Sequence, residues 1–130
     1  LRGLVGSEMC IRDSYTDGGQ LRDFIYVKDA VDMTLFFLEQ PDVGGVFNVG
    51  TGNARNWNDL AKATFAAMGI EPNIEYIDMP DNLRDKYQYF TQATTDKLRA
   101  AGYEKDTTSL EDAVTDYVQN YLMKEAYLGG

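Results

Sequence analysis

The feature that most constrains the fold of this chain is a repeated exchange between short apolar runs and helical patterns, with glycine at the junctions. Residues 21–27 form a β-branched and aromatic run after Gly18 and Gly19, which predicts a strand. Apolar residues at three- and four-residue spacing then predict a helix over residues 30–40, and we expect Asp29 to cap it. A strand followed directly by a helix is the repeating unit of α/β folds.

The helix predicted at 30–40 carries an apolar stripe that should face the core. Val31, Leu35 and Leu38 are separated by four and three residues and so lie on one side of a helix. The stripe is widened by four further apolar residues, Ala30, Met33, Phe36 and Phe37. At the start of the last helix, Thr108 and Glu111 match a capping box. We therefore expect an α/β domain in which helices cover apolar strands. The further predicted elements are strands at 46–49 and 74–77 and helices at 56–69, 94–102 and 108–123.

The composition limits the partners that this protein can have. Its 130 residues carry a formal net charge of −9, which would repel the phosphate backbone of a nucleic acid. No apolar run approaches the roughly 18 to 20 residues that cross a bilayer, and no secretory signal pattern opens the sequence. We therefore expect a cytoplasmic protein that binds neither nucleic acid nor membrane, and any anionic ligand must be held by a local basic group.

The counts of histidine and cysteine exclude several kinds of site. Histidine is absent, and cysteine occurs once, at Cys10. A Ser-His-Asp or Cys-His nucleophile, a zinc site built on histidine and an intrachain disulfide are thereby ruled out. We predict no metal site, and tyrosine, lysine, aspartate and glutamate remain for proton chemistry.

The two ends of the chain differ in character from its middle. Residues 1–14 begin with leucine and follow neither a strand nor a helix period, and we interpret them as a non-native leader from a sequencing artefact, with a divergent loop as the alternative. Residues 15–123 hold the predicted elements, and residues 124–130 are expected to fray. Because the first residue is not methionine, we expect the chain to be a fragment of a longer protein.

Arg22 is the first candidate binding residue, because it lies inside the predicted strand that follows the glycine turn. Its planar guanidinium can donate two parallel hydrogen bonds to a diphosphate. A surface ion pair with Asp23 or Asp29 is the competing interpretation, and the residues taken alone favour it.

A second glycine turn follows the strand predicted at 46–49. Gly50 and Gly52 imitate the opening of a dinucleotide-binding fingerprint, whose glycines let a helix approach a pyrophosphate. Arg55 stands where the third glycine of that fingerprint should be, and no acidic residue stands about 20 positions further on at the end of a strand, since Asp78 lies too far. We therefore interpret this turn as structural and predict no cofactor-binding residue in the chain.

The segment 83–92 gathers cations and aromatic rings. A tyrosine such as Tyr87 can contact a sugar or a base with its ring and still donate a hydrogen bond from its hydroxyl. Arg84, Lys86 and the more distant Lys28 could help to neutralise phosphate. A loop that only packs its rings onto the core is the alternative explanation.

Three stretches of sequence together resemble a known family. RDFIYVKD at 22–29 and FNVGTG at 47–52 are similar to the carboxyl-terminal half of the extended short-chain dehydrogenase/reductases, which include the sugar-nucleotide epimerases and dehydratases. KYQYFTQ at 86–92 is similar to the subfamily that acts on ADP-heptose. The resemblance implies that Arg22 grips the diphosphate of the substrate and that Tyr87 also contacts the substrate.

The resemblance further implies what the chain lacks. In the family, a nicotinamide cofactor oxidises the sugar transiently, and a tyrosine with a lysine four residues later supplies the acid and base. No such pair occurs here. We expect residues 15–123 to be the substrate-binding portion of an isomerase that is homo-oligomeric when complete and binds NADP through a missing amino-terminal Rossmann half. We predict no catalytic residue in this chain and no turnover by the chain alone.

Two alternatives stay open. The first is another member of the family, such as a UDP-glucose 4-epimerase or a dTDP-sugar dehydratase, which the KYQYFTQ stretch disfavours. The second is a non-catalytic nucleotide-binding or adaptor domain of similar α/β build, which would leave Arg22 and Tyr87 unexplained.

Overall fold

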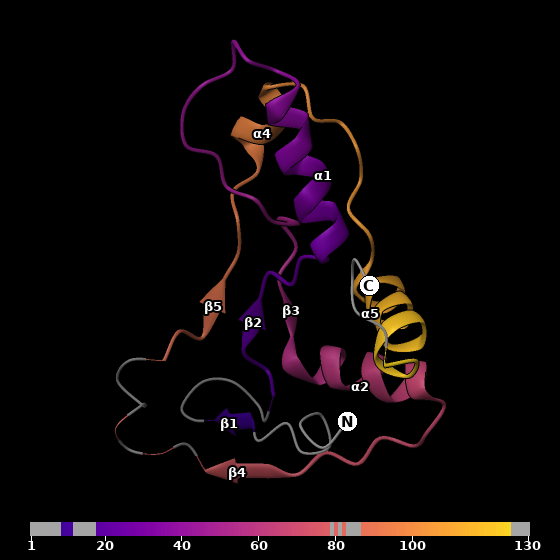
Figure 1. The fold of residues 1–130 in the computed structure, drawn as a ribbon. Coiled ribbons are helices and arrows are strands. Elements are labelled where there is room, and N and C mark those ends of the chain that lie inside the picture. The colour runs from indigo at the N-terminus through magenta and orange to yellow at the C-terminus, as the bar shows by residue number, and fades with distance from the viewer. Residues whose placement is uncertain (1–8, 12–17, 79, 81, 83–86, 126–130) are drawn as a thin grey trace.

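A computed structural model describes residues 9–11, 18–78, 80, 82 and 87–125 of the chain. Figure 1 shows helices α1 and α4 on one side of a small central sheet and helices α2 and α5 on the other side. Strands and helices are interspersed along the chain, and the predicted α/β class is confirmed.

The central sheet is small, and Arg22 lies on its middle strand. The strand order is β3–β2–β5, with β2 at Leu21–Arg22, β3 at Arg55–Asn56 and β5 at Phe90–Thr91. β3 runs antiparallel to β2, and β5 runs parallel to it. β2 is shorter than the predicted strand 21–27, because only its first two residues pair with neighbouring strands.

The strand predicted at 46–49 does not form in the described part of the chain. Val46 is 86% exposed, and its carbonyl accepts a hydrogen bond from Lys97 Nζ at 2.7 Å instead of joining a ladder. A strand exists only where a second strand supplies hydrogen-bond partners for its backbone. The prediction was wrong because an apolar run can favour an extended backbone, but a strand also needs a second strand to pair with, and the run itself does not provide one.

Helix α1 spans Val27–Leu38 and packs on α4, which spans Asp96–Ala100. Met33 of α1 is fully enclosed by a cluster that includes Leu98 and Tyr103. The helix predicted at 94–102 therefore forms, although it is shorter than expected. This cluster is one part of the hydrophobic core.

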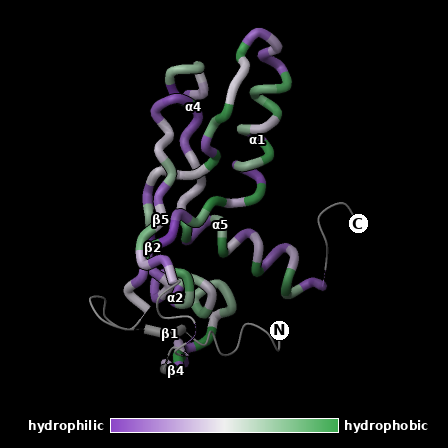
Figure 2. Tube along the Cα trace, turned by 90° about the vertical axis from the view of Figure 1, so that its left-hand side faces the viewer, coloured by the Kyte–Doolittle hydropathy of each residue, from purple (hydrophilic) through white to green (hydrophobic). Residues whose placement is uncertain are grey.

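Part of the apolar stripe predicted to face the core lies on the exposed side of α1. Val31, Leu35 and Leu38 are all at least half exposed, with Leu38 at 77%. Figure 2 shows hydrophobic positions repeated along α1. The prediction is confirmed for Met33, Phe36 and Phe37, which pack in the core, and was wrong for Val31, Leu35 and Leu38. Helix α1 is apolar on two sides, and the described residues cover only the side that carries Met33.

Helix α2 spans Trp57–Met68 and agrees with its predicted ends. The Asn56 side chain accepts a hydrogen bond from the Asp59 backbone N–H at 2.7 Å and so caps the amino terminus. Gly69 adopts the left-handed conformation, with φ of 70°, and ends the helix. Helix α2 also contacts the last helical segment, and the buried side chains on these two segments are Ala61, Ala63, Phe65, Ala67, Leu110, Ala113 and Val118.

The last helical segment consists of α5 at Leu110–Tyr117 and a π-helical turn, η1, at Val118–Leu122. Its predicted capping box is displaced by one residue, since Ser109 rather than Thr108 is the cap and accepts from the Asp112 N–H at 3.1 Å. Glu111 is not part of this cap.

Asp29 was expected to cap α1, but the structure gives it a different role. Tyr26 stands at the cap position, and Asp29 is the third residue of the helix. Its carboxylate accepts hydrogen bonds from the backbone N–H of Thr108 at 2.7 Å and from the Thr108 hydroxyl at 2.9 Å. Asp29 therefore ties α1 to the start of α5, and this long-range contact removes Thr108 from the capping box.

A separate pair of parallel strands joins β1 at Met9–Ile11 to β4 at Tyr76–Asp78. β4 corresponds to the strand predicted at 74–77, and β1 falls within the predicted leader. Residues 1–8, 12–14 and 126–130 lie outside the described residues, so the hypotheses of an artefactual leader and a frayed tail stay predictions. None of the helices in the described ranges has the length and apolar character of a membrane span.

Candidate functional site

The structure brings Arg22 and Tyr87 together. The parallel pairing of β2 with β5 places the residues that enter β5 beside Arg22. The guanidinium carbon of Arg22 lies 5.2 Å from the centroid of the Tyr87 ring, which is within the range of a cation–π contact. Arg22 Nη1 donates to the carbonyl of Leu21 at 2.8 Å, and Nη2 donates to the carbonyl of Gln88. The two predicted binding residues therefore share one corner of the sheet.

The surface ion pair proposed as the competing role of Arg22 is absent. Asp23 bonds to other segments, and Asp29 bonds to Thr108. In residues 18–78 and 87–125 no carboxylate forms an ion pair with Arg22. Two of its five N–H groups donate to described carbonyls, so the guanidinium keeps its charge and further donors for an anion.

A second arginine lies directly opposite Arg22 in the sheet but is engaged elsewhere. Arg55 is the register partner of Arg22 on β3. Its guanidinium contacts Asp59 at 3.0 Å and Glu111 at 2.6 Å. These carboxylates raise the pKa of Arg55, the hydrogen bond with Glu111 being the larger cause. They also neutralise a like-charge contact that would otherwise disfavour the pairing of β2 with β3.

The Gly50–Gly52 turn is held by Asp23, which the sequence suggested only as an ion-pair partner of Arg22. The Asp23 carboxylate accepts hydrogen bonds from the Thr51 N–H at 2.9 Å, from the Thr51 hydroxyl and from the Gly52 N–H at 2.8 Å. The amides that could have received a pyrophosphate are therefore taken by a carboxylate of the same chain. The described residues do not fit a nicotinamide dinucleotide at this turn. The sequence contained one hint of this contact, because the backbone N–H groups of a glycine turn need a hydrogen-bond acceptor.

The predicted electrostatic helpers are dispersed. Lys28 Nζ pairs with Asp116 at 2.7 Å and lies over the rings of Tyr26 and Tyr121, and it does not lie in contact with Arg22. Arg84 and Lys86 lie outside the described residues.

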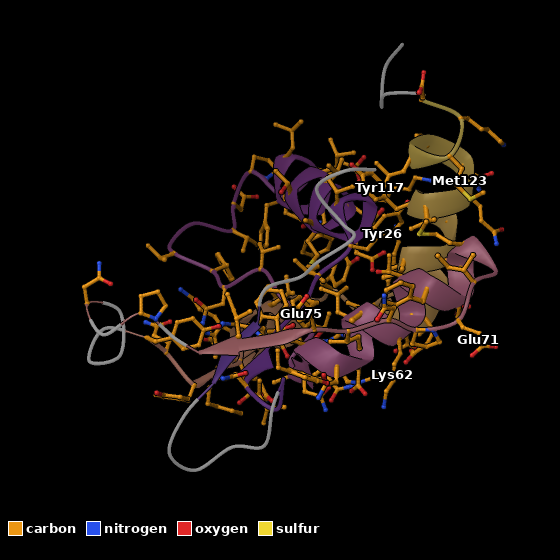
Figure 3. All side chains as sticks on the ribbon, turned by 90° about the horizontal axis from the view of Figure 1, so that it is seen from below. Tyr26, Lys62, Glu71, Glu75, Tyr117 and Met123 are labelled. Carbon is orange, nitrogen blue, oxygen red and sulfur yellow. The ribbon has the colours of Figure 1, made fainter. Side chains whose placement is uncertain are left out.

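An apolar groove of about 900 Å³ lies apart from the Arg22 and Tyr87 pair. Residues 23–27 form one wall, and α2 and α5 form the others. Figure 3 shows Tyr26 and Tyr117, both of which line the groove, close together beside α5. The groove has no basic lining residue, so it does not suit a diphosphate, and neither Arg22 nor Tyr87 lines it.

Comparison with known proteins defines the class of this chain. The model of the NAD dependent epimerase/dehydratase family matches residues 4–50, a range that begins inside the predicted leader. The α/β fold and the relatives below agree with this match, and the chain is therefore similar to part of the members of that family. A curated relative, the ADP-L-glycero-D-manno-heptose-6-epimerase of Nitratidesulfovibrio vulgaris (strain DP4), is 64% identical over 108 residues, covering 83% of this chain and 33% of the relative.

Solved structures share the fold. The UDP-N-acetylglucosamine 4-epimerase from Methanobrevibacter ruminantium M1, in complex with UDP-N-acetylmuramic acid, has a TM-score of 0.70 and 24% identity, covering 85% of this chain and 34% of that chain. MoeE5 in complex with UDP-glucose and NAD has a TM-score of 0.66 and 30% identity, covering 88% of this chain and 36% of that chain. The chain thus spans about a third of the length of these relatives.

Proposed function

We propose that this chain forms the substrate-binding portion of an ADP-L-glycero-D-manno-heptose 6-epimerase. Arg22 donates hydrogen bonds to the diphosphate of ADP-heptose, and Tyr87 contacts the same substrate. The observation that carries the proposal is the approach of Tyr87 to a guanidinium that is not paired with any described carboxylate. The 64% identity with the relative from Nitratidesulfovibrio vulgaris supports ADP-heptose as the substrate.

The same proposal extends to the complete enzyme. It is an isomerase that uses NADP, and the cofactor is bound by an amino-terminal Rossmann half outside this chain. The occupied amides of the Gly50–Gly52 turn support that placement of the cofactor. The exposed apolar stripe of α1 and the groove beside α5 support packing of this chain against that other half. The enzyme is a cytoplasmic homo-oligomer that supplies heptose for the lipopolysaccharide core.

A hybrid enzyme provides the test of the substrate site. In this hybrid, residues 18–125 replace the equivalent segment of the Nitratidesulfovibrio vulgaris relative. Arg22→Ala should weaken ADP-heptose binding by about 1.5–3 kcal/mol, the range for a hydrogen bond with a charged group. This corresponds to a dissociation constant raised roughly 10- to 150-fold, measured by calorimetry.

Lys62→Ala is the matched control for Arg22→Ala. It removes one positive charge from an exposed position, and Figure 3 shows Lys62 on the side of α2 away from Tyr26 and Tyr117. Equal effects of the two substitutions would mean that only net charge matters, and the proposal would then fail.

The relative affinity for ADP and UDP distinguishes the proposed function from its two alternatives. Calorimetry of the hybrid and of the 130-residue chain with ADP and with UDP should give tighter binding of ADP. Tighter binding of UDP would favour a UDP-sugar epimerase. Binding of neither nucleotide by either protein would favour an adaptor domain.

A further inference from the structure

Asp23 lies next to Arg22 in sequence but serves the opposite side of the strand. Consecutive side chains of extended backbone point to opposite faces, so an arginine that faces Tyr87 leaves its neighbour facing away. Asp23 Oδ1 accepts from the N–H and the hydroxyl of Thr51. Asp23 Oδ2 accepts from the Gly52 N–H at 2.8 Å and from the Ala93 N–H at 3.0 Å. One carboxylate thus joins β2, the glycine turn and the segment that leaves β5.

The bond from Ala93 matters because the ladder between β2 and β5 is only two residues long. Leu21 is paired with Phe90, and Arg22 is paired with Thr91. So short a ladder specifies its register weakly. A slip by one residue would move Tyr87 by about 3.3 Å and turn its side chain to the other face. The Ala93 bond lies beyond the ladder, and a slip would break it.

The packing around Asp23 leaves little freedom for another arrangement. Gly50 is buried, and a Cβ atom placed on it would lie 2.4 Å from the Cβ of Ala93 and 2.9 Å from Asp23 Oδ2. The glycine turn and the segment after β5 therefore cross in contact at Asp23. Burial opposes ionisation of this carboxyl, but the hydrogen bonds from Thr51, Ala93 and Gly52 outweigh it and lower the pKa of Asp23.

We infer that Asp23 is a positioning residue for the nucleotide-sugar site. Its carboxylate sets the register of residues 87–93 against β2 and thereby holds Tyr87 beside Arg22. This inference rests on the proposed function, because the value of that register lies in the substrate contacts of Arg22 and Tyr87. Asp23 itself touches no substrate in this scheme.

Asp23→Asn in the hybrid enzyme tests the inference. It keeps the size of the side chain but replaces one acceptor oxygen by an N–H donor that faces backbone N–H groups. We expect KM for ADP-heptose to rise about tenfold with kcat changed by less than about threefold, since the substitution removes binding contacts and leaves the chemical step in place. Amide hydrogen exchange of residues 87–93 should become faster.

Asp32→Asn is the matched control. Asp32 also bridges distant groups, because it accepts from the Tyr103 hydroxyl at 2.8 Å and from Lys105 Nζ at 2.6 Å, but it contacts neither Arg22 nor Tyr87. It should lower thermal stability without changing KM or the exchange of residues 87–93. A rise in KM for Asp32→Asn equal to that for Asp23→Asn would overturn the inference.

A double-mutant cycle adds a measurement that a mere loss of stability would not change. Tyr87→Ala should raise KM about fivefold in the wild-type hybrid, as expected for loss of an aromatic contact, and have little effect in the Asp23→Asn background. The same factor in both backgrounds would show that Asp23 does not place Tyr87. If Asp23→Asn fails to fold, Ala93→Pro removes the backbone N–H that donates to Asp23 Oδ2, and an unchanged KM for it would equally overturn the inference.

The two levels of the proposal fail in different ways. If Arg22→Ala raises KM but Asp23→Asn does not, only the role of Asp23 is wrong. If Arg22→Ala leaves KM unchanged, the substrate site itself is wrong, and the role of Asp23 in substrate binding falls with it.

Discussion

At the scale of single residues, carboxylates hold this chain together. Its strands are two or three residues long, so ladders alone do not fix the segments relative to one another. Asp23 joins three segments, Asp29 joins α1 to Thr108, and Asp116 accepts from Tyr26 and Lys28. Although the formal net charge is −9, some of the acidic side chains are engaged in contacts within the chain rather than with solvent.

Tyr103 gives a pH-dependent prediction at this scale. The Tyr103 side chain is buried and donates to Asp32, and burial, followed by that hydrogen bond, raises the pKa of Tyr103 to about 12. Since the phenol has a pKa of about 10 when unfolded, its stabilising contribution is complete below pH 10 and is lost as the pH rises from about 10 to 12. Tyr103→Phe should lower the unfolding free energy by about 1 kcal/mol at pH 8.

The measurement is chemical unfolding of the hybrid enzyme at pH 8 and pH 11. The difference between wild type and Tyr103→Phe should shrink at the higher pH, because at pH 11 the Tyr103 phenol ionises in the unfolded chain but must keep its proton in the folded one, which favours unfolding. A difference that is the same at both pH values would contradict the assignment. Tyr76→Phe is the control, because Tyr76 is exposed and its hydroxyl donates to Asn58 rather than to a carboxylate.

At the scale of elements, local signals predicted local features. Helix α2 begins and ends where its sequence indicates, because both its cap and its glycine stop act within one turn. The predictions failed where a distant partner decides the outcome. Asp29 and Thr108 bond to each other across the chain, and the run at 46–49 has no neighbouring strand in the described part.

The candidate site follows the same rule. Arg22 and Tyr87 could be named from sequence motifs, and the pairing of β2 with β5 then brought them together. Asp23 could not be assigned a role from sequence, because its partners Thr51, Gly52 and Ala93 come from two other segments. A residue that holds separate segments together becomes visible only when those segments have been placed.

The cap of α2 provides a prediction for a single element. Asn56→Ala removes the acceptor of the Asp59 N–H and should lower the unfolding free energy of the hybrid enzyme by about 1 kcal/mol. Asn53→Ala is the control, since the Asn53 side chain is exposed and makes no cap. Thermal unfolding followed by circular dichroism measures both. Equal losses in the two variants would mean that the helix does not depend on this cap.

At the scale of the whole molecule, several apolar surfaces of the described residues are not covered by other parts of the chain. The stripe of α1, the groove beside α5 and the unpaired run at 46–49 are apolar and exposed to solvent. Apolar surface of this extent marks a site of contact with other protein. A chain that spans about a third of its relatives has the surfaces expected of one part of a larger enzyme.

The last prediction concerns activity. The 130-residue chain has no tyrosine followed by a lysine four residues later, and the Thr51 and Gly52 amides of its glycine turn are occupied by Asp23. The chain alone, supplied with NADP and ADP-heptose, should therefore give no epimerised product, whereas the hybrid enzyme should convert the substrate because the other half supplies cofactor and proton transfer. Chromatographic separation of the two ADP-heptose epimers measures both. Product formation by the isolated chain would place a catalytic acid and base within these residues and contradict the division of labour proposed for the two halves.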